Sequence, residues 1–126
     1  MKRVAALQSK ADKAVIGAAM EQLAESFLVA QGLQVLARNH RCRFGELDLI
    51  VRDESVLVFV EVRFRRSAQF GGAAASVDRR KQQRLIAAAQ DYLQFHPLPL
   101  PCRFDVVAIS NQHDINWIQH AFIIES

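Results

Sequence analysis

The 126-residue chain has only two cysteines, four scattered histidines and no long hydrophobic run. Cys42 and Cys102 form no CxxC pair and are interpreted as idle thiols, because a zinc site that combined them with His40 would lack the usual ligand spacing. The longest aliphatic stretch, Val56 to Val60, is far too short to span a membrane, and the run from Val4 to Leu7 is too short for a signal peptide. The scattered histidines indicate no catalytic triad. We therefore expect a soluble, cytoplasmic protein.

What is present is the composition of an ordinary globular domain, with 51% hydrophobic and 23% charged residues and no internal repeat. A chain of this length can bury roughly 65–70% of its unfolded surface, so we expect residues 1–126 to form a single domain.

Charge is distributed unevenly along the chain. The window from Arg63 to Arg84 has a net charge of +6, whereas the rest of the chain sums to −3. Its basic residues are Arg63, Arg65, Arg66, Arg79, Arg80, Lys81 and Arg84. Such a window suits a polyanion such as a nucleic acid, although an ordinary solvated surface has the same pattern.

The stretch from Gly45 to Arg66 is typical of a β-hairpin, because it contains two apolar runs separated by Asp53, Glu54 and Ser55. Alternation in the first run places Leu47, Leu49 and Val51 on one face and Glu46, Asp48 and Ile50 on the other. The second run is apolar on both faces and is predicted to be a central strand, covered on both sides.

Carboxylates interrupt this hairpin where a core strand would prefer apolar side chains. Glu46 and Asp48 lie in the first run, and Glu61 lies near the end of the second, two residues before Arg63. Ionised carboxylates are costly to bury unless cations, hydrogen bonds or a metal ion compensate them. A divalent cation is the simplest way to neutralise two such groups.

Helical periodicity predicts one helix from about Asp12 to Gln31, with Gly32 as its stop. Its expected apolar stripe is Ile16, Met20, Leu23 and Phe27. Glu21 lies at the edge of this stripe, either as an ordinary boundary residue or reaching toward the sheet.

A second helix is predicted from Val77 to Phe95, capped by Ser76 and ended by the prolines that follow. Its expected inward column is Val77, Lys81, Leu85, Ala88, Tyr92 and Phe95. The Lys81 amine either reaches water or is delivered to the carboxylates. The loop before this helix, residues 67–76, is either a plain connection or a segment that approaches a ligand.

Further strands are predicted at Leu33–Arg41, Cys102–Ser110 and, in the tail, Ile115–Ile124, with Arg103 and Asp105 as a charge pair. The order helix, three strands, helix, strand indicates an α/β fold, a mixed sheet between helices.

The segments GELDLI, VFVEVRFR, FGGAAASV and RFDVVAI resemble the YraN-like family of uncharacterised bacterial proteins over nearly the whole chain. That family in turn resembles the PD-(D/E)xK nucleases and, among them, the archaeal Holliday junction resolvases. The resemblance implies a three-layer α/β/α domain with a restriction-endonuclease-like α-β-β-β-α-β core.

The resemblance also implies an active site. Asp48 and Glu61 match the acidic positions of the nuclease motif, Val62 the intervening residue whose carbonyl can ligate metal, and Glu21 the acid of the first helix. Arg63 stands where the superfamily has lysine, and Lys81 is a possible substitute amine. The implied cofactor is Mg²⁺ or Mn²⁺, held by Asp48, Glu61 and Val62.

The implied activity is metal-dependent endonuclease cleavage of DNA, at branched or junction structures, with a homodimer as the plausible assembly. The residues expected to bind nucleic acid are Arg65, Arg66, Arg79, Arg80 and Arg84. Because arginine stays protonated, Arg63 also permits the alternative of a nucleic-acid-binding module without catalysis.

Overall fold

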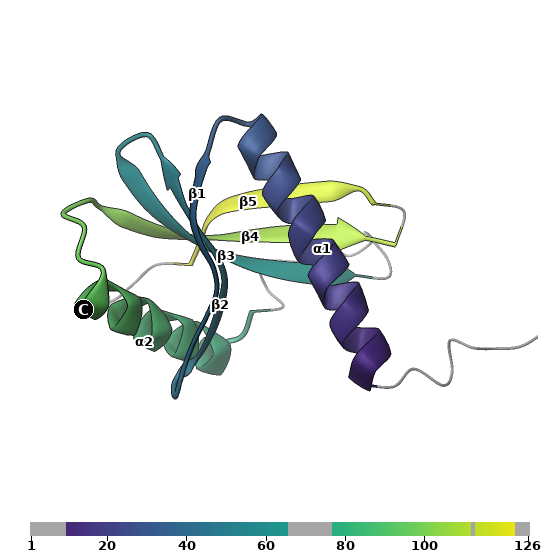
Figure 1. The fold of residues 1–126 in the computed structure, drawn as a ribbon, viewed down its shortest axis with the longest axis horizontal. Coiled ribbons are helices and arrows are strands. Elements are labelled where there is room, and N and C mark those ends of the chain that lie inside the picture. Colours follow the sequence, from purple (N-terminus) through teal and green to yellow (C-terminus); the bar gives the residue numbers. More distant parts are fainter. Residues whose placement is uncertain (1–9, 66–76, 112, 123–126) are drawn as a thin grey trace, which may run out of the picture.

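The computed structural model describes residues 10–65, 77–111 and 113–122. Its elements are α1 (Lys10–Ala30), β1 (Gln34–Cys42), β2 (Gly45–Asp53), β3 (Val56–Arg65), α2 (Arg79–Phe95), β4 (Cys102–Ser110) and β5 (Ile115–Phe122). The first six follow the predicted order, and β5 adds the strand expected in the tail (Figure 1).

The strands form one mixed sheet in the order β1-β2-β3-β4-β5. β3 is its central strand, as predicted: it pairs antiparallel with β2 and parallel with β4. The pairs β1–β2 and β4–β5 are also antiparallel.

The two helices cover opposite faces of the sheet (Figure 1). The α1 cluster is the apolar core beneath α1: Met20, Ala24, Leu28, Leu33, Leu49, Val51, Val58, Val60, Val107 and Ile109. The α2 cluster lies on the other face and comprises Leu47, Ile50, Leu57, Phe59, Val77, Leu85, Ala88, Ala89, Tyr92, Phe104, Val106 and Ala108. These two cores confirm the predicted three-layer α/β/α architecture.

Helix α1 ends as its sequence predicts. Gly32 has a φ of 97°, and the Leu33 N–H donates to the Leu28 carbonyl at 3.1 Å, which closes the last turn. The fully buried positions are Ala24 and Leu28, while most of the predicted stripe packs around them partly buried.

Helix α2 begins two residues later than predicted. Asp78 is the N-cap, since its side chain accepts the Lys81 N–H at 2.8 Å, and Ser76 lies outside the described residues. Phe95 is 67% exposed, so its assignment to the inward column was wrong. The helix turns its buried side to Leu85, Ala88, Ala89 and Tyr92.

Strict alternation along β2 was also a wrong prediction. Leu49 belongs to the α1 cluster, whereas Leu47 belongs to the α2 cluster together with Ile50. The two leucines were expected on one face. The cause lies between them, at Asp48, where the pairing of β2 with β3 ends.

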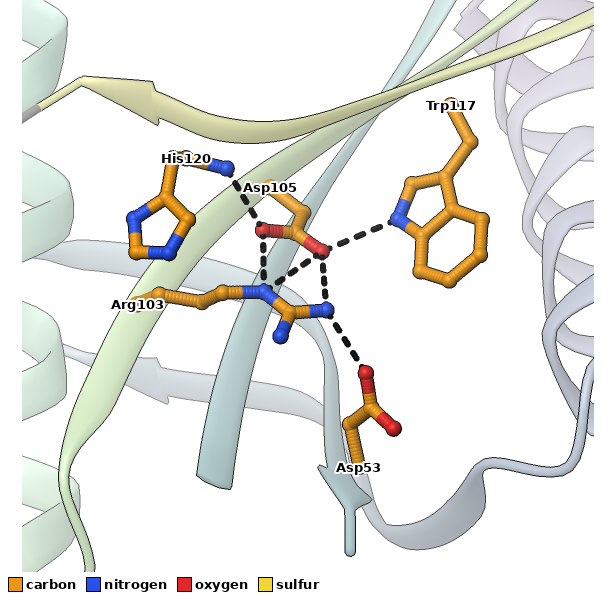
Figure 2. Close-up of polar contacts among 5 residues, drawn as sticks. All are labelled: Asp53, Arg103, Asp105, Trp117 and His120. Carbon is orange, nitrogen blue, oxygen red and sulfur yellow. Dashed lines mark hydrogen bonds and ion pairs between the residues drawn. The ribbon is translucent and has the colours of Figure 1, made fainter. Parts of the chain in front are cut away.

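The predicted charge pair of Arg103 and Asp105 is present and is part of a larger buried network (Figure 2). The Arg103 Nε donates to the Asp105 carboxylate at 3.0 Å, and its Nη2 donates to Asp53 at 3.0 Å. Asp105 also accepts the Trp117 Nε1–H at 2.9 Å and the His120 backbone N–H at 3.1 Å. Burial alone would lower the pKa of Arg103, but the hydrogen bonds and charges of both aspartates raise it above its ordinary value.

Candidate active site

The candidate site is built around Asp48, at the point where two neighbouring strands separate. Pairing between β2 and β3 runs from Asp53↔Val56 to Leu49↔Val60. At the next residue of β2, the Asp48 side chain replaces the backbone as the partner of β3, because its Oδ2 accepts the Val62 N–H at 2.8 Å. A side-chain oxygen thus satisfies a backbone donor of the central strand, which fixes the carboxylate in the opening between the strands.

Two further carboxylates converge on Asp48. Oxygens of Glu21, from α1, and of Glu46 and Asp48, from β2, all lie within 4.8 Å of one another. The Asn39 side-chain amide donates to Glu21 at 2.8 Å and to Glu46 at 3.2 Å. Asn39 has a φ of 49°, a left-handed conformation that asparagine adopts more readily than most residues. We call Glu21, Glu46 and Asp48 the acid cluster.

Burial and neighbouring carboxylates together shift the pKa of Asp48. Burial is the largest cause, the charge of Glu61 adds to it, and together with Glu21 and Glu46 they raise its pKa to about 8, against the opposing Val62 hydrogen bond. A carboxyl group with such a pKa holds a proton at neutral pH unless a cation replaces it. The acid cluster therefore has the charge and the oxygen donors that suit a divalent cation.

Glu61 is buried and meets basic groups as well as Asp48. The Lys81 Nζ and the Arg63 Nε each lie 3.6 Å from its Oε2. Of the two alternatives for Lys81, the structure therefore shows delivery of the amine to a carboxylate. Arg63 and Lys81 therefore supply positive charge beside the Glu61 carboxylate.

A pocket of about 250 Å³ gives access to the acid cluster, and Glu21, Asn39 and Asp48 line it. Its lining also includes Arg38 and Glu25, joined by hydrogen bonds of 2.6 and 2.7 Å. The Arg38 hydrogen bond holds the pKa of Glu25 below its ordinary value despite partial desolvation. Glu25 is therefore already paired with Arg38.

The structure places the predicted basic residues only in part. Arg79, Arg80 and Arg84 are exposed at the start of α2. The β1–β2 turn lies against that helix, since a Cβ built on Gly45 would be 3.7 Å from the Arg84 Cβ. Arg65 is the last residue of β3, and Arg66 and the loop 67–76 lie outside the described residues. Nucleic-acid binding by these residues stays a prediction.

Two members of the site, Glu46 and Asn39, were given no role in the sequence analysis. Glu46 had a detectable signal, because it lies two residues before Asp48 on the same strand. Asn39 had none, since only the folded chain brings β1 beside α1. The carbonyl of Val62 stays a predicted ligand, while its N–H is the Asp48 donor.

Across the described ranges, no helix is both long enough and apolar enough to cross a membrane. The model of the uncharacterised protein family UPF0102 matches residues 20–109. A UPF0102 protein of Saccharophagus degradans is 56% identical over 110 residues, which cover 86% of this chain and 92% of that relative. A UPF0102 protein of Janthinobacterium sp. is 49% identical over 121 residues, 96% of this chain and 98% of the relative. One from Ralstonia nicotianae is 56% identical over 118 residues, 90% of each chain.

Proposed function

The chain belongs to the uncharacterised protein family UPF0102, which agrees with the family resemblance of its sequence motifs. The name of this family states no activity, so we propose a function from the site itself. The proposed function is metal-dependent hydrolysis of DNA phosphodiester bonds, with branched or junction DNA as the substrate class. The observation that carries the proposal is the convergence of Glu21, Glu46 and Asp48 beside a pocket that Glu21 and Asp48 line, with Glu61 close enough to raise the pKa of Asp48.

The donor set favours Mg²⁺ or Mn²⁺, because all four side chains offer carboxylate oxygens and hard divalent cations prefer oxygen ligands. In this proposal Asp48 would hold the ion together with carboxylates from the set Glu21, Glu46 and Glu61 and with the Val62 carbonyl. When bound, the ion would polarise the phosphate and lower the pKa of an attacking water.

The protein's own groups hold this arrangement. The Val62 N–H fixes the orientation of Asp48, and the Asn39 amide holds Glu21 and Glu46 together. Lys81 and Arg63, both 3.6 Å from Glu61, provide positive charge where a phosphoryl group gains negative charge in the transition state. Lys81 can also transfer a proton, which the permanently charged Arg63 cannot. This division of roles supports catalysis even though Arg63 replaces the lysine of the superfamily motif.

The basic residues at the start of α2 support DNA as the polyanion, since phosphate contacts by lysine and arginine supply most non-specific affinity. A junction offers two scissile strands, so a two-fold homodimer would present one site to each. With DNA as its substrate, the protein is expected to act in the cytoplasm.

The test is a cleavage assay on labelled junction, flap and linear DNA with Mg²⁺ or Mn²⁺. We expect cleavage by the wild-type protein, a loss of at least about a hundredfold in Asp48→Asn and Glu61→Gln, and no change in Asp114→Asn, an exposed aspartate at the start of the β5 hairpin. Cleavage that survives both active-site substitutions overturns the proposal.

Salt-dependent DNA binding without cleavage in any metal would select the alternative, a binding module that has kept the fold. The Arg63 position is the observation that favours this alternative. A Lys81→Met variant tests the choice between the endonuclease and the binding module. The variant should bind DNA under either hypothesis, and it should lose cleavage if the protein is an endonuclease.

A further inference from the structure

Three side chains of a different chemical kind meet on the opposite side of β1, away from the acid cluster. Nitrogen, sulfur and oxygen atoms of His40, Cys42 and Asp91 all lie within 4.8 Å of one another. His40 and Cys42 come from β1, an edge strand of the sheet, and Asp91 comes from α2. We propose that these three residues form a second metal site, for a zinc-class divalent cation, that fastens β1 to α2.

The ligand types define the class of ion. Imidazole nitrogen and thiolate sulfur are softer donors than carboxylate oxygen and select zinc-like ions, whereas the all-oxygen acid cluster selects magnesium-like ions. Zinc binds histidine, cysteine and aspartate, and three protein ligands leave a fourth position for water. The two sites of this small domain would therefore take different metals.

The spacing is close to what such an ion needs. Bond lengths of about 2.0–2.3 Å place neighbouring ligands of a tetrahedral zinc ion roughly 3.3–3.6 Å apart. The His40 Nε2 and the Asp91 Oδ2 are now 3.0 Å apart as a hydrogen-bonded pair, and the Cys42 sulfur lies within 4.8 Å of a ring nitrogen of His40 and a carboxylate oxygen of Asp91. Coordination would require the three ligand atoms to close to these distances, and side chains can change rotamer to do so.

The strand and its neighbours hold the ligands in place. His40 and Cys42 are two residues apart, so they project from the same face of β1, the face turned to α2. The His40 ring packs edge-on against Tyr92, with ring centres 5.3 Å apart, which restricts its orientation. The His40 and Asp91 side chains are 18% and 22% exposed, so an ion in water can reach them.

Binding at this position has a structural consequence. β1 is an edge strand that pairs with β2. An ion held by residues of both β1 and α2 would attach β1 to the helix as well. Asn39, directly before His40, is the residue that holds Glu21 and Glu46 together. The site is nevertheless independent of the proposed nuclease activity, and it can be tested whether or not DNA is cleaved.

Cobalt(II) is the probe, because it replaces zinc in tetrahedral sites and gives a charge-transfer absorption with a thiolate ligand. Metal-free protein is titrated with Co²⁺ in the presence of excess Mg²⁺, which occupies oxygen-only sites. We expect one equivalent to bind with a thiolate–cobalt band, which Zn²⁺ then abolishes. Cys42→Ser should remove the band, and Asp91→Asn should weaken Co²⁺ binding by at least about tenfold.

Cys102→Ser is the matched control, because Cys102 is likewise a free, half-buried cysteine and its thiol contacts the Leu100 carbonyl. It should keep the band, and so should Asp48→Asn in the acid cluster. Circular dichroism of each metal-free variant establishes that it folds. A wild-type protein without the band, or a band that persists in Cys42→Ser, overturns the proposal.

Discussion

Asp48 on β2 and Asp105 on β4 are aspartates of the two strands that flank the central strand β3, and their surroundings are opposite. Each accepts a backbone N–H where the strand pairing is irregular, from Val62 for Asp48 and from His120 for Asp105, next to the irregularity between Phe104 and Val106. Asp105 also receives the Arg103 guanidinium and the Trp117 indole N–H (Figure 2). Asp48 instead faces carboxylates, whose charges help to raise its pKa to about 8.

The difference separates a carboxylate whose charge the protein balances from one whose charge it does not balance. The Asp105 charge is balanced within the protein, so it contributes to stability as the chain stands. The Asp48 charge is left to be balanced by a proton or by a cation from solution, which costs stability in the absence of that cation. The same substitution, aspartate to asparagine, should therefore have opposite consequences at the two positions.

The largest expected effect is at Asp105. Asp105→Asn should lower the free energy of unfolding at pH 7 by about 3–5 kcal/mol, because it leaves the buried Arg103 charge without its main partner. Urea denaturation measures this loss. The control, Asp114→Asn at an exposed position, should stay within about 0.5 kcal/mol of the wild type. An equally small effect of Asp105→Asn would contradict the contrast between Asp105 and Asp48.

Divalent cations should produce the next largest effect. Mg²⁺ or Mn²⁺ at 100 times its dissociation constant should stabilise the wild-type protein by about 2.7 kcal/mol through mass action, and Asp48→Asn should lose most of this gain. Thermal denaturation with and without the ion measures it. Trp117→Phe, in the Asp105 network, should respond like the wild type, and a cation effect that Asp48→Asn retains would contradict the assignment.

The pH dependence of stability should reveal Asp48 directly in metal-free protein. Its folded-state pKa of about 8 lies above the ordinary value of 3.8, so the wild type loses stability as pH rises from about 4 to about 8 and levels off above that. Asparagine cannot ionise, so Asp48→Asn should be more stable than the wild type at pH 9 and nearly equal to it at pH 4. If the wild type and Asp48→Asn were equally stable at both pH values, the pKa of Asp48 would not be raised in the folded state.

The smallest effect concerns one hydrogen bond of the balanced network. Trp117→Phe removes the indole donor to Asp105 but keeps an aromatic ring against Phe27, whose centre is 6.0 Å away. It should cost about 1–2 kcal/mol in urea denaturation, since Asp105 keeps Arg103 and the His120 N–H. A loss as large as that of Asp105→Asn would mean that the indole, and not the guanidinium, balances the charge.

Much of the fold was predictable because local rules and tertiary packing agree. The central strand has apolar residues on both faces, and Gly32 ends α1 in the left-handed conformation that glycine favours. The N-terminus of α2 was predicted less well, because Ser76 and Asp78 are both good caps and sequence does not choose between them. Phe95 was misassigned since an apolar residue at the end of a helix can extend beyond the sheet it covers.

The site was predictable where its residues lie on one hairpin, and not where it depends on the third dimension. Asp48 and Glu61 stand out as acids in apolar strands. The change of face between Leu47 and Leu49 depends on where β2 leaves β3, and strict alternation cannot show that. Asn39 and Asp91 belong to their clusters only because β1 lies between α1 and α2 in the folded chain.

The most direct test of the account is the location of a divalent cation. Crystals soaked in Mn²⁺ should show an anomalous density peak bonded to Asp48 and to at least one of Glu46, Glu21 and Glu61, and Asp48→Asn crystals treated in the same way should lack it. A peak that persists without the Asp48 carboxylate, or a wild-type acid cluster that stays free of manganese at saturating concentration, would contradict the central claim.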